Sequence, residues 1–361
     1  MGLPFISKQA KKRDHIVAVD LGGRTTKTVH LHRKSGRFEL LNYSIIDAPA
    51  YEKGFSPDVL AEHLREVVRT LGATKVRHVT LALGVNDSQF RQVELPLIPL
   101  PEMRQMLKLN SKNYLQQDLA DHVFDCFIAG TTQSSTTNRP GETAKPAGGA
   151  PRAKVMVGCT RKQLVDDLQA AVKAAGLIPD QVVPGMIAPT NAFEMAEPEI
   201  FAKEVAALVE IGFKSTTITI VNAGEIVLTR VVAIGGDRLT SGLAEAMGIS
   251  YSEAENIKVG MPGEVQQSLD PLIHPLGREL RASIDFFEHQ ADKTVSQVFV
   301  SGGSSRSEYV LQALQGELMV PCKNWSPTRF LRVTLPPEKA AELEQLAPQL
   351  TVAVGAAAVS F

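Results

Sequence analysis

Two stretches of this sequence repeat one design, and the repeat limits what the chain can fold into. Residues 17–27 read VAVDLGGRTTK, and residues 206–217 read AALVEIGFKSTT. In each stretch an apolar run typical of a β-strand ends in a carboxylate, a glycine follows two residues later, and a basic residue and paired hydroxyls come next. A repeated unit of this kind indicates a chain built from two similar halves.

Each repeat carries the groups that hold a phosphate and a metal ion. Glycines let the backbone approach an anion closely, and N–H, hydroxyl and ammonium donors complement a polyphosphate. We predict a metal ion at Asp20 and Glu210. The predicted phosphate contacts are Gly22, Gly23, Thr25, Thr26, Lys27, Gly212, Lys214, Ser215 and Thr216. Two such hairpins predict two lobes that clamp one nucleotide, although Asp20 as a hairpin cap and Lys27 as a solvated strand charge are the structural alternatives.

Composition bounds the class of protein. The 361 residues exceed one typical core, so two or three domains are expected. A net charge of -1 predicts no nucleic-acid partner and no direct attraction to anionic lipid. No run approaches the ~20 apolar residues that span a bilayer. The three cysteines are far apart and not in metal spacing, which favours buried thiols in a reducing cytoplasm.

The first 13 residues place their lysines and arginine after a short apolar stretch, the reverse of a signal peptide. We expect a solvated, disordered leader here, with contact to a membrane surface as the alternative.

The first lobe is predicted to cover 1–84 and to be completed by 184–205 and 335–361. Strands are expected at 38–46 and 78–83, with a helix between them that begins at Ser56 and Pro57 and ends at Gly72. Residues 85–183 follow the order strand, helix, strand, strand, helix, strand, which predicts a small inserted α+β domain. Its segment 131–152 has almost no large apolar side chain and predicts a flexible loop.

The second lobe is predicted to cover 206–334. After its hairpin, Gly236 leads into a helix, and Ser252 is expected to cap a short helix that places Glu255 and Lys258 one turn apart. A later strand ends in a glycine turn and a helix start, where backbone atoms lie flat against a base or ribose. The predicted nucleotide contacts of this lobe are Gly236, Glu255, Lys258, Gly302, Gly303, Ser304 and Arg306. A surface ion pair is the alternative for Glu255 and Lys258.

Five of these motifs, in this order, resemble the actin-like ATPase superfamily. The matching segments are 20–27 and 210–217 as phosphate motifs, 302–306 as the adenosine motif, 354–357 as the last connection between the lobes, and 254–258 as the Ala-Glu-x-x-Lys helix. The insertion after the fourth strand is similar to the FtsA/PilM branch. The Lys-rich leader, the VELP of 93–96, the helix that contains Tyr114 and the helix end at 174–177 resemble the PilM family of type IV pilus assembly proteins.

The resemblance implies an α/β, ribonuclease H-like, two-lobed fold that binds ATP and Mg²⁺ between its lobes. It further implies a cytoplasmic scaffold at the inner membrane that holds the short cytoplasmic tail of a PilN-like membrane protein and contacts other pilus or secretion assembly proteins. Membrane contact would then be indirect, through these partners. Nucleotide and tail would be coupled, because a nucleotide that fastens the lobes also sets the shape of the groove.

Two departures from the family pattern bear on activity. Glu210 stands where relatives usually have aspartate, which moves the carboxylate by one methylene. The first connection between the lobes, residues 183–192, contains no acidic residue, whereas relatives carry there the carboxylate that orients the attacking water. Such general-base assistance is worth typically 10²–10⁴-fold in rate. We therefore expect weak or absent hydrolysis and assign no catalytic residue.

Three alternatives belong to other classes of protein. One is a small-molecule kinase of the same superfamily, which needs a catalytic carboxylate in the first lobe. Another is an FtsA-like cell-division filament protein, which predicts a C-terminal amphipathic membrane helix. The third is a scaffold with the same fold that binds no nucleotide.

Overall fold

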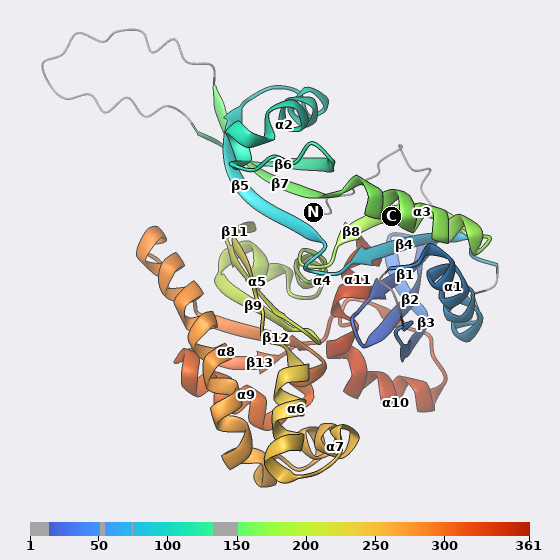
Figure 1. The fold of residues 1–361 in the computed structure, drawn as a ribbon, viewed down its shortest axis with the longest axis vertical. Helices are drawn as coiled ribbons and strands as arrows, with labels where there is room; N and C mark the ends of the chain where they lie inside the picture. The colour runs from blue at the N-terminus through green and yellow to red at the C-terminus, as the bar shows by residue number, and fades with distance from the viewer. Residues whose placement is uncertain (1–13, 51–54, 74, 133–150) are drawn as a thin grey trace, which may run out of the picture. The chain divides into compact units, whose positions relative to one another are not determined.

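The computed structural model describes residues 14–50, 55–73, 75–132 and 151–361 of the chain. These residues form two compact units, one made of Met1–Asn86 and Asp167–Phe361 and the other of Asp87–Asp166 (Figure 1). Residues 1–13, and residues 133–150 of the expected loop 131–152, lie outside the described part. The larger unit contains two sheets, and the smaller unit contains one.

The first sheet of the larger unit has six strands in the order β14-β3-β2-β1-β4-β8. β1 and β2 form an antiparallel hairpin, β3 continues it, and β4 and β8 add in parallel beside β1. The strands are β1 (His15–Leu21), β2 (Thr25–Lys34), β3 (Arg37–Asp47), β4 (His78–Leu83), β8 (Ile178–Pro184) and β14 (Arg332–Val333). The predicted strands at 38–46 and 78–83 are confirmed.

Helix α1 (Pro57–Leu71) contacts β2 and β3 of this sheet. It begins where predicted: the Ser56 side chain accepts a hydrogen bond from the Val59 N–H, and Pro57 occupies the first turn. It ends at Gly72, whose φ of 68° is a left-handed conformation that glycine adopts without strain. Its buried face carries Leu60, Ala61, Leu64, Val67, Val68 and Leu71.

The second sheet has five strands in the order β11-β10-β9-β12-β13. The strands are β9 (Val205–Ile211), β10 (Thr216–Asn222), β11 (Glu225–Val232), β12 (Gln297–Gly302) and β13 (Cys322–Asn324). Four helices accompany this sheet: α6 (Gly236–Met247), α7 (Tyr251–Gly260), α8 (Pro262–Ala291) and α9 (Glu308–Leu318). Odd-numbered residues of β9 share one buried cluster with α6, α8 and α9, so these helices cover that face of the sheet.

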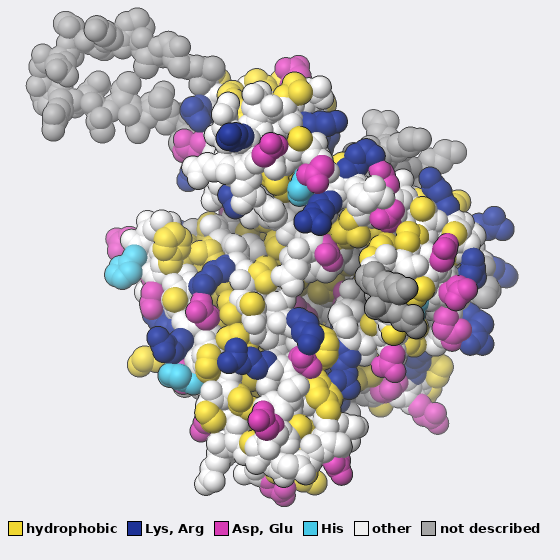
Figure 2. All heavy atoms as spheres, viewed as in Figure 1, with side chains coloured by type: hydrophobic (Ala, Val, Ile, Leu, Met, Phe, Trp, Pro, Cys, Tyr) yellow, Lys and Arg dark blue, Asp and Glu magenta, His cyan; other side chains and the backbone are white. Residues whose placement is uncertain are grey.

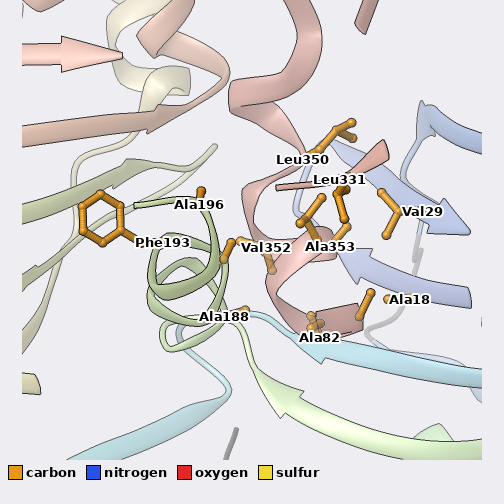
Figure 3. Close-up of a cluster of buried hydrophobic side chains, with 14 of the residues drawn as sticks. Ala18, Val29, Ala82, Ala188, Phe193, Ala196, Leu331, Leu350, Val352 and Ala353 are labelled. Atoms are coloured by element: carbon orange, nitrogen blue, oxygen red, sulfur yellow. The ribbon is translucent and has the colours of Figure 1, made fainter. Parts of the chain in front are cut away.

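A second buried cluster joins the two sheets through α4 (Ala188–Ala196) and α11 (Thr351–Ala358). Figure 3 shows α4 beside α11, with Phe193 on the side of α4 away from α11, and the centroid of the Phe193 ring lies 4.6 Å from that of Phe299 on β12 of the second sheet. Gly355 permits the close crossing of the two helices, because an added Cβ would lie 1.8 Å from the carbonyl oxygen of Ala188. The other small side chains of α11 are buried in the same cluster.

The smaller unit is a three-stranded antiparallel sheet with one helix. Its elements are β5 (Ser88–Pro96), α2 (Leu100–Leu115), β6 (His122–Thr132) and β7 (Arg152–Arg161), and the strand order is β5-β7-β6. The Arg104 guanidinium of α2 lies 2.6 Å from the buried Asp125 carboxylate of β6 and so fastens helix to sheet. Both cysteines of this unit are buried free thiols, and burial raises the pKa of each to about 11.

The structure differs from the sequence prediction in two places. The inserted unit ends at Asp166, not 183, because β8 pairs with β4 in the first sheet. α3 (Lys162–Ala174) leads from the inserted unit into β8, so the chain leaves the first sheet after β4 and returns to it parallel to β4. β14 falls within the range predicted for the second lobe, yet it pairs with β3.

The remaining elements are α5 (Pro198–Lys203), α10 (Pro337–Leu346) and two short 3₁₀ turns, η1 (Gly303–Arg306) and η2 (Ala347–Gln349). None of the helices in the described part of the chain has the length and apolar character needed to cross a membrane. On the face shown in Figure 2, acidic side chains lie among the lysines and arginines.

Candidate functional site

The two acidic residues of the repeat lie at equivalent ends of their strands. Asp20 continues the alternation of Ile16 and Ala18 along β1, and Glu210 continues that of Ala206 and Leu208 along β9. These four apolar residues all belong to the cluster between the sheets. Because alternate residues of a strand point to the same face, both carboxylates project toward the space between the two sheets.

The turns after these strands share one backbone geometry. An added Cβ at Gly22 would lie 2.5 Å from the carbonyl oxygen of Thr25, and one at Gly212 would lie 2.8 Å from that of Ser215. Each glycine is therefore required by the close approach of the returning strand, three residues later in both repeats. The repeat seen in the sequence is a repeat in the structure as well.

Asp20 and Glu210 differ in their partners. Asp20 is 8% exposed and lies 3.5 Å from the Lys27 ammonium. Burial raises the pKa of Asp20, and the charge and hydrogen bond of Lys27 act against that rise. Glu210 accepts a hydrogen bond from the Ser301 hydroxyl of β12. Burial raises the pKa of Glu210 to about 8, with Ser301 and the Lys27 charge opposing the rise and the Asp20 charge adding to it.

These two carboxylates fit a magnesium ion that is held jointly by protein and nucleotide. Mg²⁺ commonly takes one or two carboxylates together with substrate phosphates and waters. Among residues 14–50, 55–73, 75–132 and 151–361, no group of three or more His, Cys, Asp or Glu side chains is placed to hold a metal ion by itself. The protein alone therefore offers a partial coordination shell that phosphate oxygens would complete.

Helix α7 brings a buried charge network to the site. Lys258 is 1% exposed in its side chain, and its ammonium lies 2.8 Å from the Glu255 carboxylate. Thr240 of α6 donates to Glu255 at 2.6 Å and accepts from Lys258 at 2.7 Å. Burial lowers the pKa of Lys258, and the Glu255 charge opposes that fall. Burial acts to raise the pKa of Glu255, but Lys258 and Thr240 outweigh it and the net shift is downward.

The expected cap of this helix is wrong by two residues. Ser250, not Ser252, accepts from the Glu253 N–H, and the Glu253 side chain accepts from the Ser250 N–H in return. This reciprocal pair is a capping box, which satisfies two backbone donors at the helix start.

A third glycine turn follows β12 beside the second repeat. Gly302 has a φ of 91°, and its Cα lies against β9, since an added Cβ would be 2.2 Å from the Ile211 carbonyl oxygen. The chain then enters η1, where the Ser304 hydroxyl lies 3.4 Å from the Lys258 ammonium. An added Cβ at Gly236 would meet this same hydroxyl at 2.4 Å. The starts of α6 and η1 and the side of α7 therefore converge on one point.

All these elements surround one cavity of about 230 Å³. Its lining comes from both repeats, from α6, α7 and η1, and from η2. The lining residues are Arg24, Thr25, Lys27, Glu210, Ile211, Gly212, Phe213, Gly236, Tyr251, Glu255, Lys258, Gly302, Gly303, Ser304, Arg306 and Gln349. Eleven of the eighteen residues predicted from the sequence are in this set, drawn from both repeats, from the start of α6, from α7 and from the glycine turn after β12, whereas the 354–357 motif contributes none.

Some predicted residues have other partners. Lys214 is exposed and pairs with Asp237 at 2.6 Å. Thr26 is fully buried, with its hydroxyl 2.7 Å from Nε2 of His63 on α1. Thr216 is also fully buried and donates to the Ile234 carbonyl at 2.7 Å. Ser215 is buried, and the lining does not include it or Asp20, Gly22 and Gly23 of the first repeat.

The sequence analysis missed five lining residues that the structure brings in: Arg24, Ile211, Phe213, Tyr251 and Gln349. Arg24 and Phe213 stand inside the two motifs, so their positions were available in the sequence. Tyr251 becomes the first residue of α7 only once Ser250 is recognised as the cap. Gln349 reaches the cavity from η2, far along the chain, and no local pattern marks it.

Two sheets that each carry one hairpin of the repeat, with a cavity between the hairpins, define an actin-like ATPase fold. The chain is similar over 97% of its length to 99% of a chain in the structure of a PilM–PilN type IV pilus biogenesis complex, with a TM-score of 0.79 and 21% identity. It is also similar to the ethanolamine utilization protein EutJ from Carboxydothermus hydrogenoformans, with a TM-score of 0.55 and 16% identity over 98% of this chain and 92% of that one. At these identities the likeness shows the fold.

A family model for the type IV pilus assembly protein PilM matches residues 18–361. The match spans nearly the whole sequence, so the chain belongs to the PilM family. The resemblance inferred from the motifs is thereby confirmed.

Proposed function

We propose that this protein is a nucleotide-binding scaffold of type IV pilus assembly or of related type II secretion assembly, which holds ATP and Mg²⁺ between its two lobes. One observation carries the proposal: both repeated hairpins line one cavity, the first with the cations Arg24 and Lys27 and the second with the Glu210 carboxylate. Asp20 and Glu210 would share the metal ion with phosphate oxygens. Lys27 from one side and the backbone donors after Gly22 and Gly212 would meet the phosphates.

The adenosine part would lie on the side of the second lobe. Glu255 and Lys258 are held in place by Thr240, and the glycine turn at Gly302 leaves backbone atoms uncovered by a side chain. Arg306 lines the same part of the cavity. The phosphates would then lie near the hairpins, and the adenosine beside α7 and η1.

Hydrolysis is proposed to be weak or absent. The strand β8 leads through Gly185 into α4, and this connection carries no acidic side chain. Both carboxylates in the described cavity lining are already engaged, Glu210 with Ser301 and Glu255 with Lys258. A water molecule near the terminal phosphate would then have no free carboxylate to act as its general base. This arrangement favours stable binding of the nucleotide over its hydrolysis.

Titration calorimetry of the full chain with ATP and Mg²⁺ tests this proposal. We expect micromolar binding, about -8 kcal/mol, that Asp20→Ala abolishes or weakens at least tenfold, with negligible phosphate release. Glu62→Ala on the exposed side of α1 is the matched control and should bind like the unaltered protein. Rapid phosphate release would overturn the scaffold proposal in favour of an active ATPase. Failure of the unaltered protein to bind would leave only the fold.

The second part of the proposal concerns the partner. Family membership, and the PilM–PilN complex to which the chain is similar, support a PilN-like inner-membrane protein whose cytoplasmic tail this protein binds. It would then act in the cytoplasm, at the inner membrane through its partners, and without a nucleic-acid ligand. The family match favours this role over the FtsA-like and kinase alternatives.

Nucleotide and tail affinity should be linked. If ATP selects one arrangement of the lobes, a tail that prefers the same arrangement binds more tightly in its presence, typically by 5-fold or more. Fluorescence anisotropy of a labelled peptide from the cognate PilN-like protein, with and without ATP and Mg²⁺, measures this linkage. Equal affinities under the two conditions would refute it.

A further inference from the structure

The two hairpin turns touch each other at one edge of the cavity. Gly23 of the first turn faces Phe213 of the second, and a Cβ added at Gly23 would lie 3.5 Å from the Phe213 ring. The next residue, Arg24, extends further: its guanidinium carbon lies 5.9 Å from the centroid of the Phe213 ring and 4.4 Å from that of Tyr251. Both aromatic residues belong to the second lobe.

Each side of this contact is anchored in its own lobe. The carbonyl of Arg24 accepts a hydrogen bond of 2.9 Å from the N–H of Ala48, just after β3 in the first sheet. Tyr251 is the first residue of α7, whose start is fixed by the capping box of Ser250 and Glu253. α7 in turn packs on α6 and α8 (Figure 1). The stack of Arg24 on Tyr251 is therefore a contact between lobes and not within one.

The corresponding cation of the second turn makes no such contact. Lys214 aligns with Arg24 in the repeat, but its ammonium pairs with Asp237 of its own lobe at 2.6 Å. Like Arg24, Lys214 lies near the Phe213 ring, with its ammonium nitrogen 4.9 Å from the ring centroid. The crossing between the lobes is thus a property of Arg24 and not of the repeated motif.

We propose that Arg24 and Tyr251 form a clasp between the lobes at the edge of the nucleotide cavity, and that this clasp slows the release of bound nucleotide. This proposal rests on the proposed nucleotide-binding function and adds two positioning residues to it. Arg24, Tyr251 and Phe213 all line the cavity, so a separation of the two turns that lets nucleotide leave has to unstack Arg24 from the ring.

The expected size of the effect follows from the exposure of the clasp. Arg24 is exposed and Tyr251 is half-buried, the setting in which a stack of cation and ring contributes a modest stabilisation. Loss of the stack should therefore raise the dissociation rate about two- to fivefold. The association rate should change little, because affinity differences among variants of one site reside mostly in dissociation.

The release rate can be measured with N-methylanthraniloyl-ATP and Mg²⁺ bound to the full chain and chased with excess ATP. Arg24→Ala and Tyr251→Ala should each accelerate release, and the double variant should release no faster than either single one. Tyr251→Phe keeps the ring and should release more slowly than Tyr251→Ala. Arg33→Ala, which removes an arginine 5.9 Å from the centroid of the Phe38 ring and outside the cavity lining, is the matched control and should leave release unchanged. Additive effects of the two alanine substitutions, or unchanged release in both, would overturn the clasp.

A thermal double-mutant cycle on nucleotide-free protein separates the clasp from the proposed function. Each alanine variant should lower Tm by about 1–3 °C, and the double variant should lower it no further. Additive Tm shifts would show that the two residues do not act together. If the unaltered protein bound no nucleotide, the proposed function and the release step would both be overturned, whereas this cycle would still decide whether the clasp exists.

Discussion

The first and second hairpin turns share a backbone and differ in how they satisfy their carboxylates. Asp20 lies 3.5 Å from a lysine on the adjacent strand, whereas Glu210 accepts a hydrogen bond from the Ser301 hydroxyl of a neighbouring strand. In the pairing of β1 with β2, Lys27 lies opposite Asp20, and in the pairing of β9 with β10, Thr217 lies opposite Glu210. The second half of the repeat thus lacks the cation that the first half holds at the same position. The two turns therefore share their backbone geometry but differ in the charges that lie beside their carboxylates.

This difference bears on the two acidic side chains when nucleotide and metal are absent: burial raises the pKa of both, and Glu210 has no lysine opposite it on the paired strand. A buried carboxylate without a cation is costly in its charged form, so it holds its proton to higher pH. Glu210 accordingly has a pKa of about 8, while Lys27 limits the rise at Asp20. The charge of a bound metal ion would compensate both carboxylates, but Glu210 has the greater need of it.

The largest expected effect is that of Glu210→Gln on stability. In the unfolded chain this carboxyl titrates near its ordinary value, so between about pH 4.5 and pH 8 the folded protein binds more protons. The contribution of the group to stability is therefore full at low pH and is lost as the pH rises through 8. The Gln variant should match the unaltered protein near pH 5 and exceed it at pH 8.5 by about 1–3 kcal/mol, a range discounted because Glu210 is half-buried.

Urea denaturation in EDTA, without nucleotide, measures this difference at the two pH values. Asp20→Asn is the matched comparison, and its gain at pH 8.5 should be smaller because it leaves Lys27 without its partner. An equal gain for Glu210→Gln at both pH values would mean that the effect is one of packing and not of protonation.

The positions of the two carboxylates could be predicted from the sequence because they depend on local alternation. An apolar strand that ends in an acid and a glycine fixes which face the acid occupies and how tightly the chain turns. Gly22 and Gly212 confirm this, as does Gly72 at the end of α1. Local rules of this kind hold wherever both partners lie within a few residues of each other.

Partners between distant segments could not be predicted in the same way. The sequence aligns Arg24 with Lys214, yet one stacks on Tyr251 and the other pairs with Asp237, because each side chain meets what its own lobe places nearby. Strand pairing could not be predicted either. The sequence of β8 indicates a strand, but only the crossover through α3 determines that this strand pairs with β4.

The misplaced cap of α7 shows how one local pattern can fit twice. Ser250 precedes Glu253 and Ser252 precedes Glu255, and both pairs have the spacing of a capping box. The structure uses the first pair, because Glu255 is engaged by Lys258 and Thr240 inside the site. A functional contact thus decides between two equivalent caps, and recognising it would have identified Tyr251 as the helix start.

The smallest expected effect tests whether the two turns also differ toward nucleotide. Lys27 lines the cavity, so Lys27→Ala should weaken ATP binding up to about tenfold, the loss of one charge-assisted contact. Lys214 is exposed and paired with Asp237, so Lys214→Ala should change the affinity less than about twofold. The same calorimetric titration with ATP and Mg²⁺ compares the two. Equal losses would indicate that Lys214 leaves Asp237 when nucleotide binds, and the two turns would then be alike in the bound state although they differ in the free one.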